Sequence, residues 1–100
     1  DTGISVRTAQ MDAQKIARIA AARQVICVTH LAQIAAMGDK NFFIEKIEKE
    51  GNTCTVLRQL EGEEIAFEIA RLSGGMHSEA AVAHGRELLQ NAANIKKQIL

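Results

Sequence analysis

The sequence predicts an α/β fold, and three patterns point to that class. A short apolar run rich in β-branched residues at 25–28 is typical of a strand buried on both faces of a parallel sheet. Two stretches of alternating polarity flank Gly51 and predict a β-hairpin. Helical patterns fill the remainder, so the expected order is helix, buried strand, helix, hairpin, helix, helix.

Length and composition restrict the class of protein further. One hundred residues suffice for a single domain, with 47% hydrophobic and 24% charged residues, which argues against disorder. There is no apolar stretch of membrane-spanning length and no segment that reads as a signal peptide. Twelve basic residues balance twelve acidic ones, so this chain alone is a poor candidate for binding nucleic acid.

The two cysteines, Cys27 and Cys54, lie in apolar or β-branched runs and lack the close spacing of a metal site. We therefore expect buried free thiols in a reducing compartment, which means a cytoplasmic protein without membrane contact.

The first helix is expected at 7–23, after a polar, turn-like start. Ser5 or Thr8 can cap it. Its apolar face is narrow and lined by small side chains, which suit close packing against a sheet. The residues of that face are Ala9, Ala13, Ile16 and Ala20.

The elements after the buried strand follow from local signals. Residues 31–37 read as a short helix closed by Gly38, and residues 41–48 and 53–59 form the hairpin. A lone parallel strand with one hairpin leaves sheet edges open, and open edges invite pairing with another chain.

Two more helices complete the chain. One is expected at 63–72 and is stopped by Gly74 and Gly75. The last begins after the N-cap Ser78 and continues to Leu100. Its regular stripe indicates packing against the sheet or, less commonly, against a partner helix. The stripe consists of Ala81, Gly85, Leu88, Ala92, Ile95 and Ile99.

His30 is the first candidate functional residue. It directly follows the expected buried strand, and open α/β sheets bind ligands beyond the carboxyl ends of their strands. An imidazole there can donate a hydrogen bond to a phosphate oxygen or position a water. The alternative at this stage is a histidine that merely precedes and caps the next helix.

The other polar groups are weaker candidates for a functional site. Asp1, Gly3 and Ser5 form a second cluster ahead of a helix, although capping explains Ser5 more simply. His77 and His84 are too few for a metal site, so no metal is expected on this chain. The chain also lacks the GxxxxGK[ST] phosphate loop, the GxSxG elbow and the HExxH motif.

Several stretches closely resemble the RecN family of bacterial DNA repair proteins. The similarity covers nearly the whole chain and includes the run Thr29, His30 and Leu31 after the apolar strand. Two departures are Val6, where the family is expected to have Gly, and Ala32, where it usually has Pro. The matching stretches are 1–10, 25–37, 43–46, 68–72 with Gly74 and Gly75, and 86–89.

The resemblance implies an SMC-like, ABC-type (P-loop) ATPase head, of which residues 1–100 form the C-terminal portion as one domain that starts at the D-loop. By this resemblance, Asp1 corresponds to the acidic residue of the D-loop, with Gly3 and Ser5 beside it. His30 corresponds to the switch histidine that senses the γ-phosphate. The run from Leu72 to Gly75 spells the start of the ABC signature, but the family's signature lies earlier in the chain, so this run is a look-alike that ends a helix.

The resemblance also implies partners that this chain lacks. The complete protein is expected to bind ATP and Mg²⁺, whereas the 100 residues alone should bind neither and should be inactive as an enzyme. The implied partners are the N-terminal half of the same head, a second head in a homodimer, and DNA through the complete protein. The implied role is recombinational repair of double-strand breaks in the bacterial cytoplasm, at the nucleoid. The competing hypothesis is an interaction module that assembles through its hairpin edge and C-terminal helix, without a nucleotide.

Overall fold

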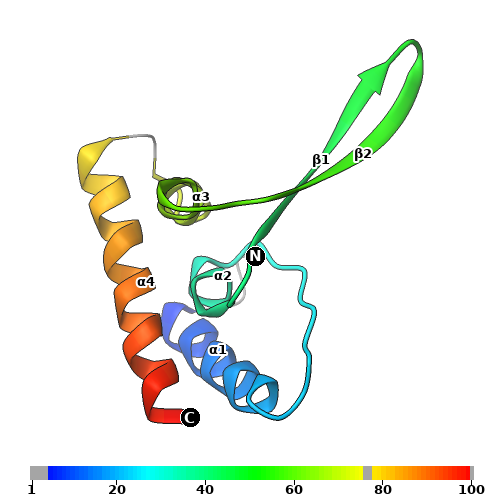
Figure 1. Cartoon of the computed structure of the whole chain (residues 1–100). Coiled ribbons are helices and arrows are strands. Elements are labelled where there is room, and N and C mark those ends of the chain that lie inside the picture. Colours follow the sequence, from blue (N-terminus) through cyan, green and yellow to red (C-terminus); the bar gives the residue numbers. More distant parts are fainter. Residues whose placement is uncertain (1–4, 76–77, 100) are drawn as a thin grey trace.

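Helices pack into a cluster from which one two-stranded hairpin projects (Figure 1). The computed structural model describes residues 5–75 and 78–99. This mixture of helix and strand agrees with the predicted class at a coarse level. The elements are α1 (Val6–Ala20), α2 (Ala32–Met37), β1 (Phe42–Lys49), β2 (Asn52–Gln59), α3 (Glu63–Leu72) and α4 (Glu79–Ile99).

The first helix, α1, begins one residue before its predicted start and ends three residues earlier than predicted. Ser5 is its N-cap, and the Ser5 hydroxyl accepts a hydrogen bond from the backbone N–H of Thr8 at 3.1 Å. Ala9 and Ala13 are buried, as the narrow apolar face predicted. The face meets other helices, however, and the expectation that it packs against a sheet was wrong.

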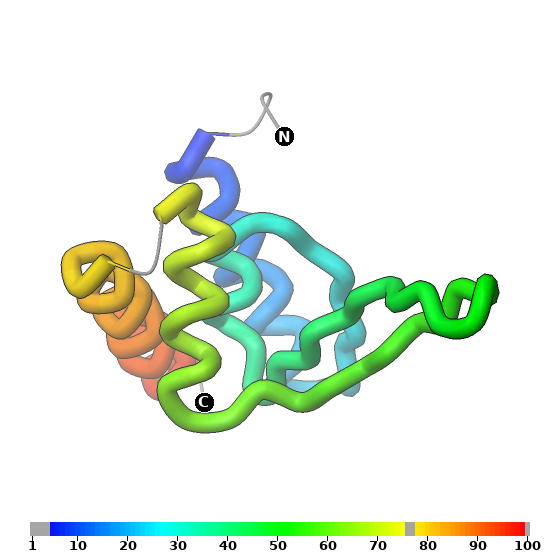
Figure 2. Tube along the Cα trace, turned by 90° about the horizontal axis from the view of Figure 1, so that it is seen from above, coloured from blue at the N-terminus to red at the C-terminus, as the bar shows by residue number. Residues whose placement is uncertain are grey.

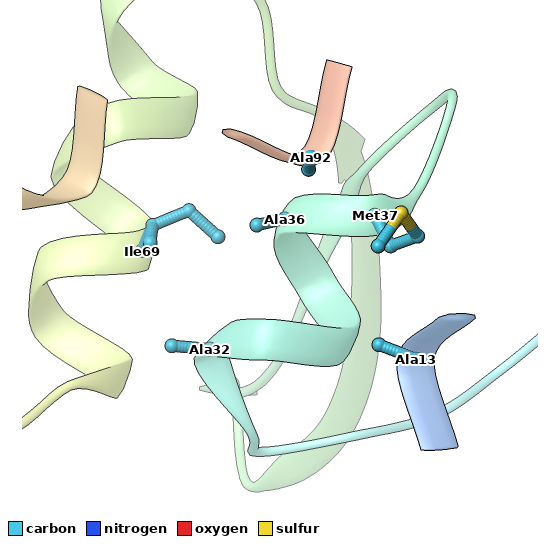
Figure 3. Packing of buried hydrophobic residues seen from close by; sticks show 6 residues of the cluster. All are labelled: Ala13, Ala32, Ala36, Met37, Ile69 and Ala92. Atoms are coloured by element: carbon cyan, nitrogen blue, oxygen red, sulfur yellow. The ribbon is translucent and has the colours of Figure 1, made fainter. Parts of the chain in front are cut away.

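The main core lies where α1, α2, α3 and α4 meet (Figure 3). Four of its six buried residues are alanines, and their small side chains let the helix backbones approach closely. Ile69 from α3 points toward the alanines of α2 and is 1% exposed. The six residues are Ala13, Ala32, Ala36, Met37, Ile69 and Ala92.

The predicted buried strand at 25–28 is not present. These residues run as an exposed loop between α1 and α2, with Ile26 and Val28 each 87% exposed. The described chain holds a single sheet made of β1 and β2, which offers this segment no neighbouring strand. Cys27 on this loop is exposed, as is Cys54 on β2, so the expectation of buried thiols was wrong, although both cysteines are free.

The hairpin has the predicted turn. Strands β1 and β2 pair antiparallel, with Lys49 opposite Asn52, so Glu50 and Gly51 form the loop. Gly51 has φ +80°, a conformation that suits glycine. Figure 2 shows the hairpin extending away from the helices, and Phe43 is the one residue of β1 and β2 that is half-buried, the others being exposed.

Two side-chain contacts join the hairpin to α3, and a backbone hydrogen bond closes the base of the hairpin itself. The Arg58 guanidinium pairs with Glu64 at 2.7 Å, and the Arg71 guanidinium lies 5.8 Å from the centre of the Phe43 ring. The buried Leu60 donates its backbone N–H to the Asn41 carbonyl at 2.9 Å. Side-chain contacts at its base therefore attach the hairpin to the helical body.

The helices α3 and α4 agree well with the predicted boundaries. α3 has the expected limits and stops before Gly74, whose φ is +83°. Ser78 caps α4 by accepting the backbone N–H of Ala81 at 3.1 Å. Gly85 and Ala92 of the predicted stripe are buried against the chain's own helices, so the expected contact with a sheet was wrong.

Two carboxylates in the first turn of α3 form ion pairs with other elements. Arg86 of α4 hydrogen-bonds Glu63 and lowers the pKa of that carboxyl below its ordinary value of 4.5. Arg58 of β2 hydrogen-bonds Glu64 and lowers its pKa in the same direction. A carboxyl with a lowered folded pKa contributes stability above its unfolded pKa, and the contribution is lost as pH falls through the folded pKa.

We therefore expect the urea midpoint of the chain at low salt to fall as the solution is taken from about pH 6 to about pH 3. The effect should be small and reduced by salt, because Glu63 and Glu64 are 57% and 48% exposed. Glu63→Gln removes one of the titrating groups, so its midpoint should fall less over that range than the midpoint of the control Glu87→Gln. Equal falls in the two variants would contradict this assignment.

Among residues 5–75 and 78–99, no helix combines the length and the apolar character that crossing a bilayer requires.

Candidate functional site

His30 lies on the surface between the exposed loop and α2. The next residue, Leu31, is the N-cap of α2, and the Leu31 carbonyl accepts the backbone N–H of Ala35 at 3.0 Å. Because α2 supplies three of the six core residues, the C-terminal side of His30 is attached directly to the buried core. An exposed imidazole at the entrance to a packed helix is well placed to meet a ligand or another segment.

The turn that contains His30 is closed by a side chain that the sequence reasoning passed over. The Leu31 backbone N–H donates to the Thr29 hydroxyl at 3.0 Å, and His30 lies between the two. Leu31 has an apolar side chain that forms no cap. A threonine two residues before an apolar N-cap is the signal that would have identified Thr29 in the sequence.

The second predicted cluster is described only in part. Asp1 and Gly3 lie outside the described residues. The Ser5 hydroxyl accepts from the Thr8 backbone N–H and donates to the Thr8 hydroxyl at 3.0 Å. Both interactions belong to the start of α1, which is the capping role that the sequence favoured for Ser5.

The structure connects Ser5 and His30 through the packing of the helices that follow them. Ser5 begins α1 and His30 precedes α2, and these helices share the core that contains Ala13 and Ala32. The two residues are thus carried by one packed unit, although each belongs to a different element.

The remaining candidates do not form a site in the part of the chain described here. Within residues 5–75 and 78–99, no three histidine, cysteine or acidic side chains are grouped so as to hold a metal ion. His84 is exposed on α4, and His77 lies outside the described residues. Lys96 pairs with Asp39 at 3.1 Å and joins α4 to the loop after α2.

A hollow of about 400 Å³ lies between α1, α2 and α4, away from the candidate residues. Its polar lining consists of carboxamides, and its floor includes Met37 and Ile95. It contains neither His30 nor Ser5 and no titratable group. The carboxamides are Gln10, Gln14, Gln33, Asn91 and Asn94.

Known proteins resemble this chain along nearly its whole length. A protein called DNA repair protein RecN from Halalkalibacterium halodurans is 44% identical over 97 residues, which is 96% of this chain and 17% of that protein. The proteins of the same name from Bacillus subtilis and Deinococcus radiodurans are 40% and 46% identical over 96% and 89% of the chain. The chain thus spans about one sixth of these relatives' length. No family model matches it.

Proposed function

The chain belongs to the RecN family, and from that premise we propose that it forms part of an ATP-binding and ATP-hydrolysing, SMC-like head. In this proposal Asp1 and its neighbours form the D-loop, and His30 is the switch histidine that senses the γ-phosphate. The head acts in recombinational repair of DNA double-strand breaks, in the bacterial cytoplasm at the nucleoid.

The observation that carries the proposal is the placement of His30. His30 is exposed immediately before a helix that is anchored in the core, and the preceding residues form an exposed loop. An imidazole held in this way can donate a hydrogen bond to a phosphate oxygen that another part of the protein binds.

The loop at 25–28 supports the idea of a larger assembly. Ile26 and Val28 are β-branched and 87% exposed, and burial of each such side chain stabilises a protein by about 1.5–3 kcal/mol. No described backbone hydrogen bond involves residues 25–28. We propose that this segment becomes a sheet strand beside strands from the N-terminal half of the same head.

The phosphate loop and the acidic ligands of Mg²⁺ must then come from the rest of the protein. The described residues of this chain hold no acidic cluster for a divalent ion. Of the proposed D-loop residues, Ser5 already uses its hydroxyl to cap α1, so Asp1 and Gly3 carry the contact with nucleotide. A second head would complete the sandwich of two nucleotides, and DNA would contact other parts of the protein.

The proposal predicts that the purified 100-residue chain shows no ATP turnover. Turnover should arise in a chimaera in which this chain replaces the matching segment of the Bacillus subtilis relative. An inactive chimaera with a native-like circular dichroism spectrum would contradict the proposal. So would turnover by the isolated chain that His30→Ala leaves unchanged.

A second candidate is an interaction module, and the hairpin is the observation that favours it. Phe42, Ile44 and Leu57 lie on one face of the ribbon and are 51%, 54% and 62% exposed. Helix α4 does not add to this surface, because Gly85 and Ala92 of its stripe are already buried. If the hairpin drives assembly, sedimentation should show an oligomer that Leu57→Lys converts to monomer, whereas a strict monomer at high concentration would exclude self-assembly.

A further inference from the structure

The backbone before His30 and the backbone after it differ in their hydrogen bonds and in their packing. On the N-terminal side, the described residues 25–28 form no backbone hydrogen bonds. On the C-terminal side, the Leu31 carbonyl accepts from Ala35 and α2 enters the core. His30 therefore lies at the border between an exposed segment and a packed helix.

The Thr29 hydroxyl connects the exposed segment with the start of the packed helix. It accepts the Leu31 backbone N–H at 3.0 Å, which closes a turn with His30 as its middle residue. Thr29 is half-buried, whereas His30 and the residues at 21–28 are exposed. The hydrogen bond thus ties the backbone before His30 to the backbone after it.

We propose that Thr29 is a positioning residue for His30: its hydroxyl fixes the turn from which the imidazole projects toward the phosphate. This inference rests on the proposed function, since it assigns Thr29 to the same site. Thr29 itself has no contact with the nucleotide in this scheme. It restricts the directions available to His30, so that fewer conformations must be selected when the γ-phosphate arrives.

The first arm of the test measures the turn in the chain itself, by amide hydrogen exchange and NMR couplings. In Thr29→Val, which keeps the shape and loses the hydroxyl, we expect the Leu31 amide to exchange about fivefold faster and the His30 side chain to average among rotamers. Thr29→Ser retains the acceptor and should restore both readouts. Ser78→Ala removes a different hydroxyl acceptor, the N-cap of α4, and should leave His30 unchanged.

The second arm measures ATP turnover in the chimaera. We expect Thr29→Val to lower kcat about 3- to 10-fold with little change in KM for ATP, and Thr29→Ser to restore it. A Leu31 amide and a His30 rotamer that are unchanged in Thr29→Val would overturn the positioning role, whatever the turnover. If the turn loosens as expected but neither Thr29→Val nor His30→Ala changes turnover, the proposed function fails and the structural role of Thr29 stands.

Discussion

Replacement of His30 by alanine in the chimaera should lower kcat for ATP by about 100-fold. The imidazole in the proposed head donates a hydrogen bond to the γ-phosphate as charge develops on it, and alanine has no donor. Folding should be unaffected, because His30 is exposed and contributes nothing to the buried core. The measurements are steady-state ATP turnover and the urea midpoint of the same preparation.

A matched control for this variant is His84→Ala. His84 is also exposed, but it lies on α4, away from the turn before α2. We expect this variant to retain turnover within about twofold, since single surface substitutions perturb little. Full turnover in His30→Ala, or an equal loss in both variants, would contradict the role assigned to His30.

The second large effect is expected at Gly85, where α4 crosses α3. A Cβ atom at this position would lie 2.6 Å from the Ala66 carbonyl oxygen and 3.4 Å from the Ala70 backbone nitrogen. The obstacle is helix backbone, which cannot move aside as a flexible side chain can. Gly85→Ala should therefore push the helices apart and destabilise the chain by about 2–3 kcal/mol, despite a gain of about 1 kcal/mol in helix propensity.

Urea unfolding of the chain measures this effect, and Ala83→Gly provides the comparison. Ala83 is exposed on the same helix, so its replacement by glycine reports helix propensity alone, at about 1 kcal/mol. If Gly85→Ala raised the urea midpoint, the gain in helix propensity would exceed the cost of the contact between the new methyl group and the α3 backbone. That result would refute the close approach of α4 to α3.

Elements defined by local signals were predicted well. The hairpin follows from two alternating stretches around Gly51, and α3 and α4 follow from their apolar spacing and from the cap at Ser78. These signals act within a few residues along the chain. They specify an element, but they leave open which surface the element will meet.

The errors concern contacts that depend on distant parts of a protein. An apolar run such as 25–28 has the same composition whether or not a neighbouring strand is available, and the described chain supplies none. The apolar face of α1 was expected to meet a sheet, and that of α4 a sheet or, less commonly, a partner helix, whereas both pack against helices of the same chain. Cys27 and Cys54 were predicted buried because they lie in apolar or β-branched runs, and both residues are exposed.

The residues of the candidate site also differ in whether a local sequence pattern could identify them. His30 was singled out because it follows an apolar run, which is a local pattern. The structure places it before α2 at the end of a loop and not of a strand, so its role stays a prediction. Thr29 was missed because its role depends on a hydrogen bond to a helix start whose own N-cap is a leucine. Asp1 and Gly3 lie outside the described residues, so their role stays a prediction.

The most direct test of the central claim is the nucleotide dependence of the chemical reactivity of His30 in the chimaera. Diethyl pyrocarbonate modifies accessible imidazoles, and peptide mass spectrometry distinguishes His30 from the exposed reference His84. A non-hydrolysable ATP analogue should slow modification of His30 severalfold, ADP should not, and His84 should react equally in both. Equal reactivity of His30 with the analogue and with ADP would contradict a histidine that senses the γ-phosphate.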